Sequence, residues 1–356
     1  MAGSVDRRFE AVREAFAEVL AGQAGSGAAV AVWSAGAWVV DLWGGPAGAG
    51  PWRQDSIVQP YSVTKPFAAV AALVLVDSGL LDLDASARRY WPELRADATV
   101  RQILSHQAGV VALAEPADTA VFYDWDRLCA LLAAQEPSWP PGTAHGESAL
   151  FYGHLVGELV RRVDGRTPGR FLREEVCGPL GLDFAIGLTP AEAARAVPLT
   201  GLDDEFRAAA LVGKPPLYGP AIDNPPGARD AAVVNGAAWR AAEVPAVNGH
   251  GTARAVAGLY TALAEGRLLS PGLLADATTV QCAGPDQVFG HDNAWGLGFG
   301  VYGDGEYGMG GLGGSFGGAT PAYTVAFLTG SMGDHDRADH VENAVRECLG
   351  MPPLED

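Results

Sequence analysis

Strand-like segments stand near both ends of this 356-residue chain, and the long middle section between them is helical. Residues 28–34 and 37–43 are rich in Val, Ala and Trp and are joined by an Ala-Gly turn, which predicts a β-hairpin. Strand-like sequence returns at 295–303 and 321–330, whereas residues 82–244 consist of helical fragments interrupted by Pro and Gly. This arrangement predicts an α/β fold in which one sheet is built from both chain ends and a mainly helical lobe is inserted between them.

The same pattern predicts how the chain divides into lobes. We expect residues 1–81 and 245–356 to form the α/β lobe and residues 82–244 to form the helical lobe, with an active site at the seam between them. The sequence also predicts four helices, near residues 9–20, 66–77, 253–265 and 337–349.

Charge and composition exclude several classes of function. The chain carries 24 basic and 42 acidic residues, and a net charge of −18 repels both nucleic acid and anionic membrane surfaces. No apolar stretch reaches the roughly 20 residues that span a bilayer, and the N-terminal segment is amphipathic, unlike a signal peptide. Four scattered cysteines without a CxxC pair, and histidines without HxH or HExxH spacing, indicate neither a metal nor a cofactor. Free thiols are typical of a cytoplasmic protein.

The segment QPYSVTKPF places a serine and a lysine three residues apart at a predicted helix start. One helical turn brings Lys65 to the same face as Ser62. An N–H at the helix start is also suited to stabilise an oxyanion. Ser62 and Lys65 are therefore either a helix cap followed by a surface lysine or a nucleophile with the base that activates it. The spacing alone does not separate these interpretations.

A series of motifs along the chain provides the missing context. PYSVTKPF, SGLLDLDASARRYWPEL, VRQILSHQAGV, PPGTAHGESALFYGHLVGELVRRVDGRTPGRF, CGPLGL, NGHGTARAVAGLY and YGMGGLGGSFGG follow one another in the order of the serine β-lactamase-like superfamily. The chain most resembles the class C branch, the esterases of β-lactamase type. The resemblance implies the β-lactamase/transpeptidase-like fold and an acyl-transfer enzyme. It further implies a serine nucleophile, a neighbouring lysine, a tyrosine from the helical lobe, and a third motif on a strand edge.

Two positions depart from the family pattern. Counting from PGT at 141–143, the tyrosine position is occupied by Glu147. In the third motif the position of the usual lysine or histidine holds Met309, whose thioether neither titrates nor carries charge. The glycines of this motif remain, including Gly311, so the strand edge can approach a ligand closely. The Leu312 N–H matches the family's second oxyanion donor, beside that of Ser62.

Three further expectations concern the surroundings of this pair. Glu147 either holds Lys65 charged, or is itself the base with Lys65 orienting it, or lies exposed on a shifted loop. Tyr152 stands where the family has an aromatic packing residue and is expected beside the site, mainly in a structural role. His145 is a candidate replacement acid or base, without an assigned role.

These observations leave three hypotheses for function. The first is a serine acyl-enzyme hydrolase or acyltransferase that acts on an ester, thioester or amide of a small molecule. The second is a repurposed biosynthetic enzyme that uses Glu147 as acid or base without an acyl-enzyme, and the third is a silent ligand-binding homologue. β-Lactamase activity itself is disfavoured, because Met309 cannot pair with a substrate carboxylate.

Overall fold

The computed structural model describes residues 1–23, 25–303 and 305–354. Within them the main feature is an antiparallel sheet of nine strands. In spatial order these are β1 (Ala2–Val5), β3 (Ala37–Gly44), β2 (Ala28–Ser34), β13 (Tyr323–Thr329), β12 (Ser315–Ala319), β11 (Glu306–Gly311), β10 (Gly300–Gly303), β9 (Asp292–Trp295) and β8 (Cys282–Pro285).

The two chain ends meet in the middle of this sheet. Strands β2 and β13 pair along their whole length, from Ser34 opposite Tyr323 to Ala28 opposite Thr329. The predicted α/β fold, with one sheet built from both ends of the chain, is therefore confirmed.

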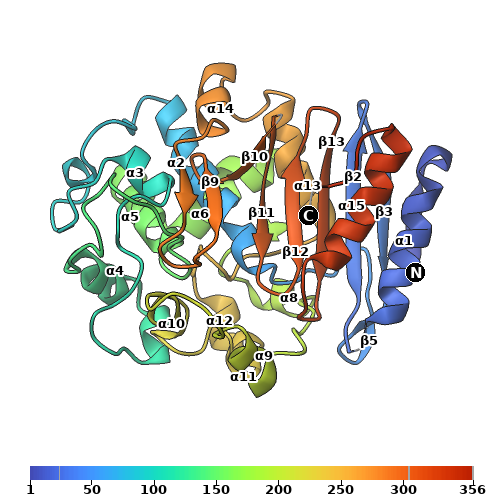
Figure 1. Cartoon of the computed structure of the whole chain (residues 1–356), viewed down its shortest axis with the longest axis horizontal. Coiled ribbons are helices and arrows are strands. Elements are labelled where there is room, and N and C mark those ends of the chain that lie inside the picture. The colour runs from blue at the N-terminus through green and yellow to red at the C-terminus, as the bar shows by residue number, and fades with distance from the viewer. Residues whose placement is uncertain (24, 304, 355–356) are drawn as a thin grey trace.

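Helices cover both faces of the sheet, and β2 shows why. Its side chains alternate between two buried clusters, and both clusters are apolar. Val30 and Val32 point toward α1 (Glu10–Gly22) and α15 (Asp336–Leu349), which lie side by side on one face, as Figure 1 shows. Ala29 and Ala31 belong to the cluster on the opposite face, which also contains residues of α2 (Lys65–Asp77) and α13 (Ala253–Ala264).

Helix α2 is buried almost all round, because its residues from Lys65 to Leu73 are apolar apart from the lysine itself. On the side away from the sheet it contacts the region that was predicted to be helical. That region contains η3 (Ala87–Arg89), α3 (Val100–Leu104), η4 (Thr119–Tyr123), α4 (Trp125–Ala133), α5 (Tyr152–Asp164), α6 (Pro168–Leu172), η5 (Arg173–Cys177), α7 (Gly178–Leu180), α8 (Pro190–Ala193), α9 (Asp204–Ala209), α10 (Tyr218–Asp223), α11 (Ala231–Val234) and α12 (Ala237–Ala241).

The remaining elements are short. Two small sheets are formed by β4 (Pro46–Ala47) with β5 (Gly50–Pro51) and by β6 (Phe184–Ala185) with β7 (His250–Gly251). A 3-10 turn, η1 (Arg7–Phe9), precedes α1, and α14 (Pro271–Ala277) precedes β8. In the described part of the chain, no helix has both the length and the apolar character needed to cross a membrane.

Most predicted elements match the structure to within a few residues, and one differs. The segment 295–303, predicted as one strand, is divided between the end of β9 at Trp295 and the start of β10 at Gly300. The chain turns between them at Gly298, whose φ of +91° favours glycine. A Cβ at this position would lie 2.2 Å from the Cβ of Ala69 in α2, so the turn packs directly on the helix that carries Lys65. The division into two lobes at residues 81 and 244 stays a prediction.

Candidate active site

Ser62 lies in a short 3-10 turn, η2 (Tyr61–Thr64), that leads directly into α2. The residue before it, Tyr61, has a φ of +49°, a left-handed conformation that is uncommon for a residue with a side chain. Tyr61 is held there because its ring is buried and its hydroxyl donates a hydrogen bond of 3.0 Å to the carbonyl of Ala228. Strain of this kind is common at functional sites, and here it sits immediately before the predicted nucleophile.

Ser62, Lys65 and Glu147 form one hydrogen-bonded group. The Lys65 Nζ donates to the Ser62 Oγ over 2.7 Å and contacts the Glu147 Oε1 at 2.8 Å. The Ser62 hydroxyl also lies 3.2 Å from that same Oε1. The Glu147 carboxylate therefore faces Lys65, as the first two interpretations of this residue require, and does not lie exposed on a shifted loop.

Burial controls the electrostatics of this group. The side chain of Lys65 is fully buried, and burial lowers its pKa because the ammonium form loses its hydration. Charge attraction and hydrogen bonding from Glu147 act in the opposite direction and raise it. The Glu147 side chain is 13% exposed, so it is the member of the ion pair that reaches solvent.

The edge of β11 forms the opposite side of the site. A Cβ on Gly311 would lie 2.1 Å from the carbonyl oxygen of Pro60, so the end of β11 approaches the turn that carries Ser62 as closely as glycine allows. Leu312 follows directly, and among the described residues no backbone acceptor takes its N–H. Met309 is only 3% exposed. This is the strand edge on which the sequence predicted the second oxyanion donor.

A cavity of about 650 Å³ opens above Ser62. Glu147, Met309, Gly311 and Leu312 also line it, so these predicted site residues share one cavity. Its walls are mostly apolar or aromatic, formed in part by Leu150, Tyr218, Ile222, Phe289, Val301 and Tyr302. A cavity of this size and lining suits a small organic molecule.

Two predicted residues lie outside this cavity. Tyr152 is fully buried, and its hydroxyl donates to the carbonyl of Leu104 over 3.0 Å, which is a packing role. His145 is 5% exposed, and its Nε2 lies 2.8 Å from the Asn293 Oδ1. Neither side chain lines the cavity, and a role for either in the reaction stays a prediction.

Sequence reasoning also missed residues that shape the site. Arg229 lines the cavity but is paired with Asp223, over 3.0 Å between Nε and Oδ1. Asp286 accepts the backbone N–H of Glu147 over 2.9 Å. Neither belongs to a recognisable motif, and the partner of Asp286 is a backbone group, which leaves no trace in the sequence. Within the described residues, no cluster of three or more His, Cys, Asp or Glu side chains is arranged to hold a metal ion.

The chain is similar to known proteins along most of its length. A family profile described as "Beta-lactamase" matches residues 12–347. The esterase/beta-lactamase LipL of Mycobacterium tuberculosis is 34% identical over 288 residues, which are 74% of this chain and 64% of LipL. This chain thus spans less than two thirds of the length of that relative.

Two solved structures resemble the whole chain. A family VIII carboxylesterase is 36% identical with a TM-score of 0.88, over 98% of this chain and 99% of the other. A penicillin-binding protein homolog from Caulobacter crescentus is 35% identical with a TM-score of 0.87, over the same two fractions.

Proposed function

This chain belongs to the beta-lactamase family, and we propose that it is a serine hydrolase that cleaves small, uncharged carboxylic esters through an acyl-enzyme on Ser62. The observation that carries the proposal is the contact of the Ser62 Oγ with both the Lys65 Nζ, at 2.7 Å, and the Glu147 Oε1, at 3.2 Å, at the floor of a cavity. A nucleophile within hydrogen-bond reach of its proton acceptor is the signature of covalent catalysis. The names of its relatives, an esterase/beta-lactamase and a carboxylesterase, support an ester as substrate.

The first half of the reaction forms the acyl-enzyme. The Ser62 Oγ attacks the ester carbonyl carbon, and its proton passes to the pair formed by Lys65 and Glu147. The N–H groups of Ser62 and Leu312 stabilise the oxyanion of the tetrahedral intermediate. When the bond to the alcohol oxygen breaks, the alcohol leaves with a proton returned by the same pair.

The second half releases the acid. A water molecule attacks the acyl carbon and gives its proton to the pair of Lys65 and Glu147. The bond between the carbon and the Ser62 Oγ then breaks, and Ser62 recovers its proton. Glu147 is suited to exchange protons with water and leaving group because it is the partly exposed member of the pair.

The charges around the cavity support an uncharged substrate. Arg229 lines the cavity and is paired with Asp223, and Lys65 beside Ser62 is paired with Glu147, so the charges of these two cations are balanced. Met309 offers no positive charge at the strand edge. A substrate carboxylate would lose its hydration without gaining an ionic partner, which costs free energy.

Labelling and turnover test the proposal together. We expect a fluorophosphonate to add one equivalent to the wild-type protein, with the label on Ser62 by peptide mass spectrometry, and no label on Ser62→Ala. p-Nitrophenyl butyrate should be hydrolysed by the wild type, and Ser62→Ala should lower kcat/KM by several orders of magnitude. Retained turnover in Ser62→Ala would exclude the acyl-enzyme. An unlabelled wild type that still binds ligands would support chemistry without an acyl-enzyme, or a binding protein.

A further inference from the structure

Glu147 has no regular secondary structure to hold it. It lies in residues 144–148, which form neither helix nor strand. Its position therefore depends on individual hydrogen bonds to this segment, and these come from two sides.

His106 holds the segment from one side. Its carbonyl accepts the Gly146 N–H over 3.1 Å, and its Nδ1 accepts the Ser148 N–H over 3.2 Å. Burial lowers the pKa of His106 to about 3, so the ring stays neutral and its Nδ1 remains an acceptor. These two bonds flank Glu147 without touching it.

Asp286 holds Glu147 from the other side. This aspartate is 1% exposed and lies in the loop between β8 and β9. Its Oδ2 accepts the Glu147 N–H over 2.9 Å and the Asn293 Nδ2 over 3.0 Å. Its Oδ1 accepts the N–H groups of Val288 and Phe289 over 2.7 and 2.8 Å. A buried carboxylate with four donors is fully satisfied, and it does not need Lys65 or any other cation.

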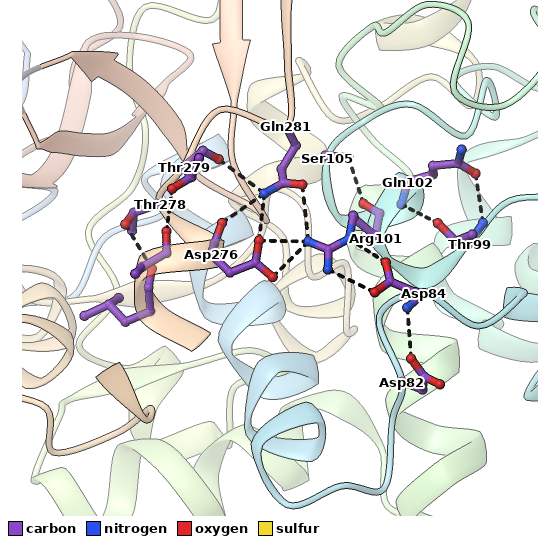
Figure 2. Close-up of polar contacts among 12 residues, drawn as sticks. Asp82, Asp84, Thr99, Arg101, Gln102, Ser105, Asp276, Thr278, Thr279 and Gln281 are labelled. Carbon is purple, nitrogen blue, oxygen red and sulfur yellow. Dashed lines mark hydrogen bonds and ion pairs between the residues drawn. The ribbon is translucent and has the colours of Figure 1, made fainter. Parts of the chain in front are cut away.

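Strands β8 and β9 form a hairpin, and its base is also fixed to the helical region. Figure 2 shows Arg101 of α3 between Asp84 on one side and Asp276 and Gln281 on the other. The Gln281 N–H in turn donates to the carbonyl of Trp295 across the hairpin. The segment that carries Arg101 also carries His106, so one short stretch of chain positions both the hairpin and the Glu147 loop.

From these contacts we infer that Asp286 is a positioning residue for the reaction, which acts by fixing the backbone of Glu147 so that its carboxylate bridges Ser62 and Lys65. The expected loss of rate rests on the proposed function, whereas the contacts of Asp286 do not depend on it. Three donors to Asp286 come from its own hairpin and the fourth from Glu147, 139 residues earlier in the chain. The aspartate thus ties a rigid sheet edge to an irregular loop at the position that departs from the family pattern.

The variant Asp286→Asn tests this role. It keeps the shape of the side chain, and its oxygen is favoured on the side of the Val288 and Phe289 N–H groups, because these backbone donors cannot turn whereas the Asn293 amide can. The NH₂ then faces the Glu147 N–H, and that hydrogen bond is lost. We expect kcat for p-nitrophenyl butyrate to fall about 10- to 100-fold, the range that a displacement of about 1 Å produces, with KM within about threefold of the wild type. Glu243→Gln is the control, because Glu243 also accepts a backbone N–H, that of Gly169 over 2.8 Å, and lies outside the cavity. Its kcat should stay at the wild-type value.

A double-mutant cycle separates positioning from a general loss of structure. In a Glu147→Gln background, Asp286→Asn should cost less than about threefold, because the carboxylate that it positions is already gone. Equal losses in both backgrounds, or an unchanged kcat in Asp286→Asn, would overturn the inference.

A crystal structure of Asp286→Asn gives a readout that does not depend on activity. The Glu147 Oε1 should leave hydrogen-bond distance of the Lys65 Nζ in this variant and keep it in Glu243→Gln. A carboxylate that stays in place in Asp286→Asn would refute the positioning role. Failure of the proposed function would be seen separately, as a wild-type Ser62 that fluorophosphonate does not label.

Discussion

Replacement of Gly311 by alanine tests whether the approach of β11 to the Ser62 turn determines catalysis. The new methyl group would lie 2.1 Å from the Pro60 carbonyl oxygen, whereas ordinary contact begins at 3.4 Å. The strand and the turn must therefore separate by about 1.3 Å at this point. Such overpacking typically costs about 1–3 kcal/mol of stability. A misplacement of about 1 Å between reacting groups costs about 100-fold in rate.

We therefore expect kcat/KM for p-nitrophenyl butyrate to fall about 100-fold in Gly311→Ala, since the Leu312 N–H moves away from the oxyanion. Tm by differential scanning calorimetry should fall by only a few degrees. Gly27→Ala is the matched control, because its Cβ would lie 2.0 Å from the carbonyl oxygen of Gly44, outside the cavity. It should lower Tm similarly and leave kcat/KM unchanged. A folded Gly311→Ala enzyme within twofold of the wild-type rate would refute the reasoning.

Three other predictions concern the ion pair and the hairpin. In the wild type, kcat/KM should rise toward alkaline pH as Lys65 loses its proton. Because Glu147 raises the pKa of Lys65, Glu147→Gln should move this rise to lower pH. A pH–rate profile that instead moves to higher pH would contradict this. Glu147→Tyr should increase hydrolysis of p-nitrophenyl esters, and more so with Met309→His, because the two changes rebuild the proton relay of similar esterases. No gain in either variant would mean that Glu147 is the better partner for Lys65. Arg101→Met should lower the free energy of unfolding, measured in urea, by about 1–3 kcal/mol, because the charged hydrogen bonds of Arg101 are lost. Arg101→Lys should recover less than half of this loss, because lysine lacks the planar guanidinium that binds two acceptors at once.

The contact between Ser62 and Lys65 could be predicted from the sequence because local spacing determines it, whereas their catalytic role stays a prediction. Ser62 and Lys65 stand one helical turn apart, and the strong apolar character of the following segment indicates that the lysine is buried. The position of Glu147 followed from counting along a motif. Its contact with Lys65 could be proposed in this way, but the choice among its possible placements needed the structure.

The parts that sequence reasoning missed are short or depend on distant backbone groups. Strands β8 and β9 read CAGP and DNAW, which lack the β-branched residues that mark a strand. The role of Asp286 depends on N–H groups, and every residue except proline carries one. The left-handed conformation of Tyr61 could not be predicted either, because residues with a side chain rarely adopt it.

The pairing of β2 with β13 has a consequence for how the molecule is made. The two strands are separated by nearly 300 residues, and all of these residues must be synthesised before β13 can pair with β2. The sheet cannot close before β13 has been synthesised, and contacts between such distant segments slow folding because a long loop must first be closed. Until then the edge of β2 that pairs with β13 remains open and prone to association with strands of other chains. We therefore expect C-terminal truncations that remove β13 to yield aggregated protein, with no shorter active fragment.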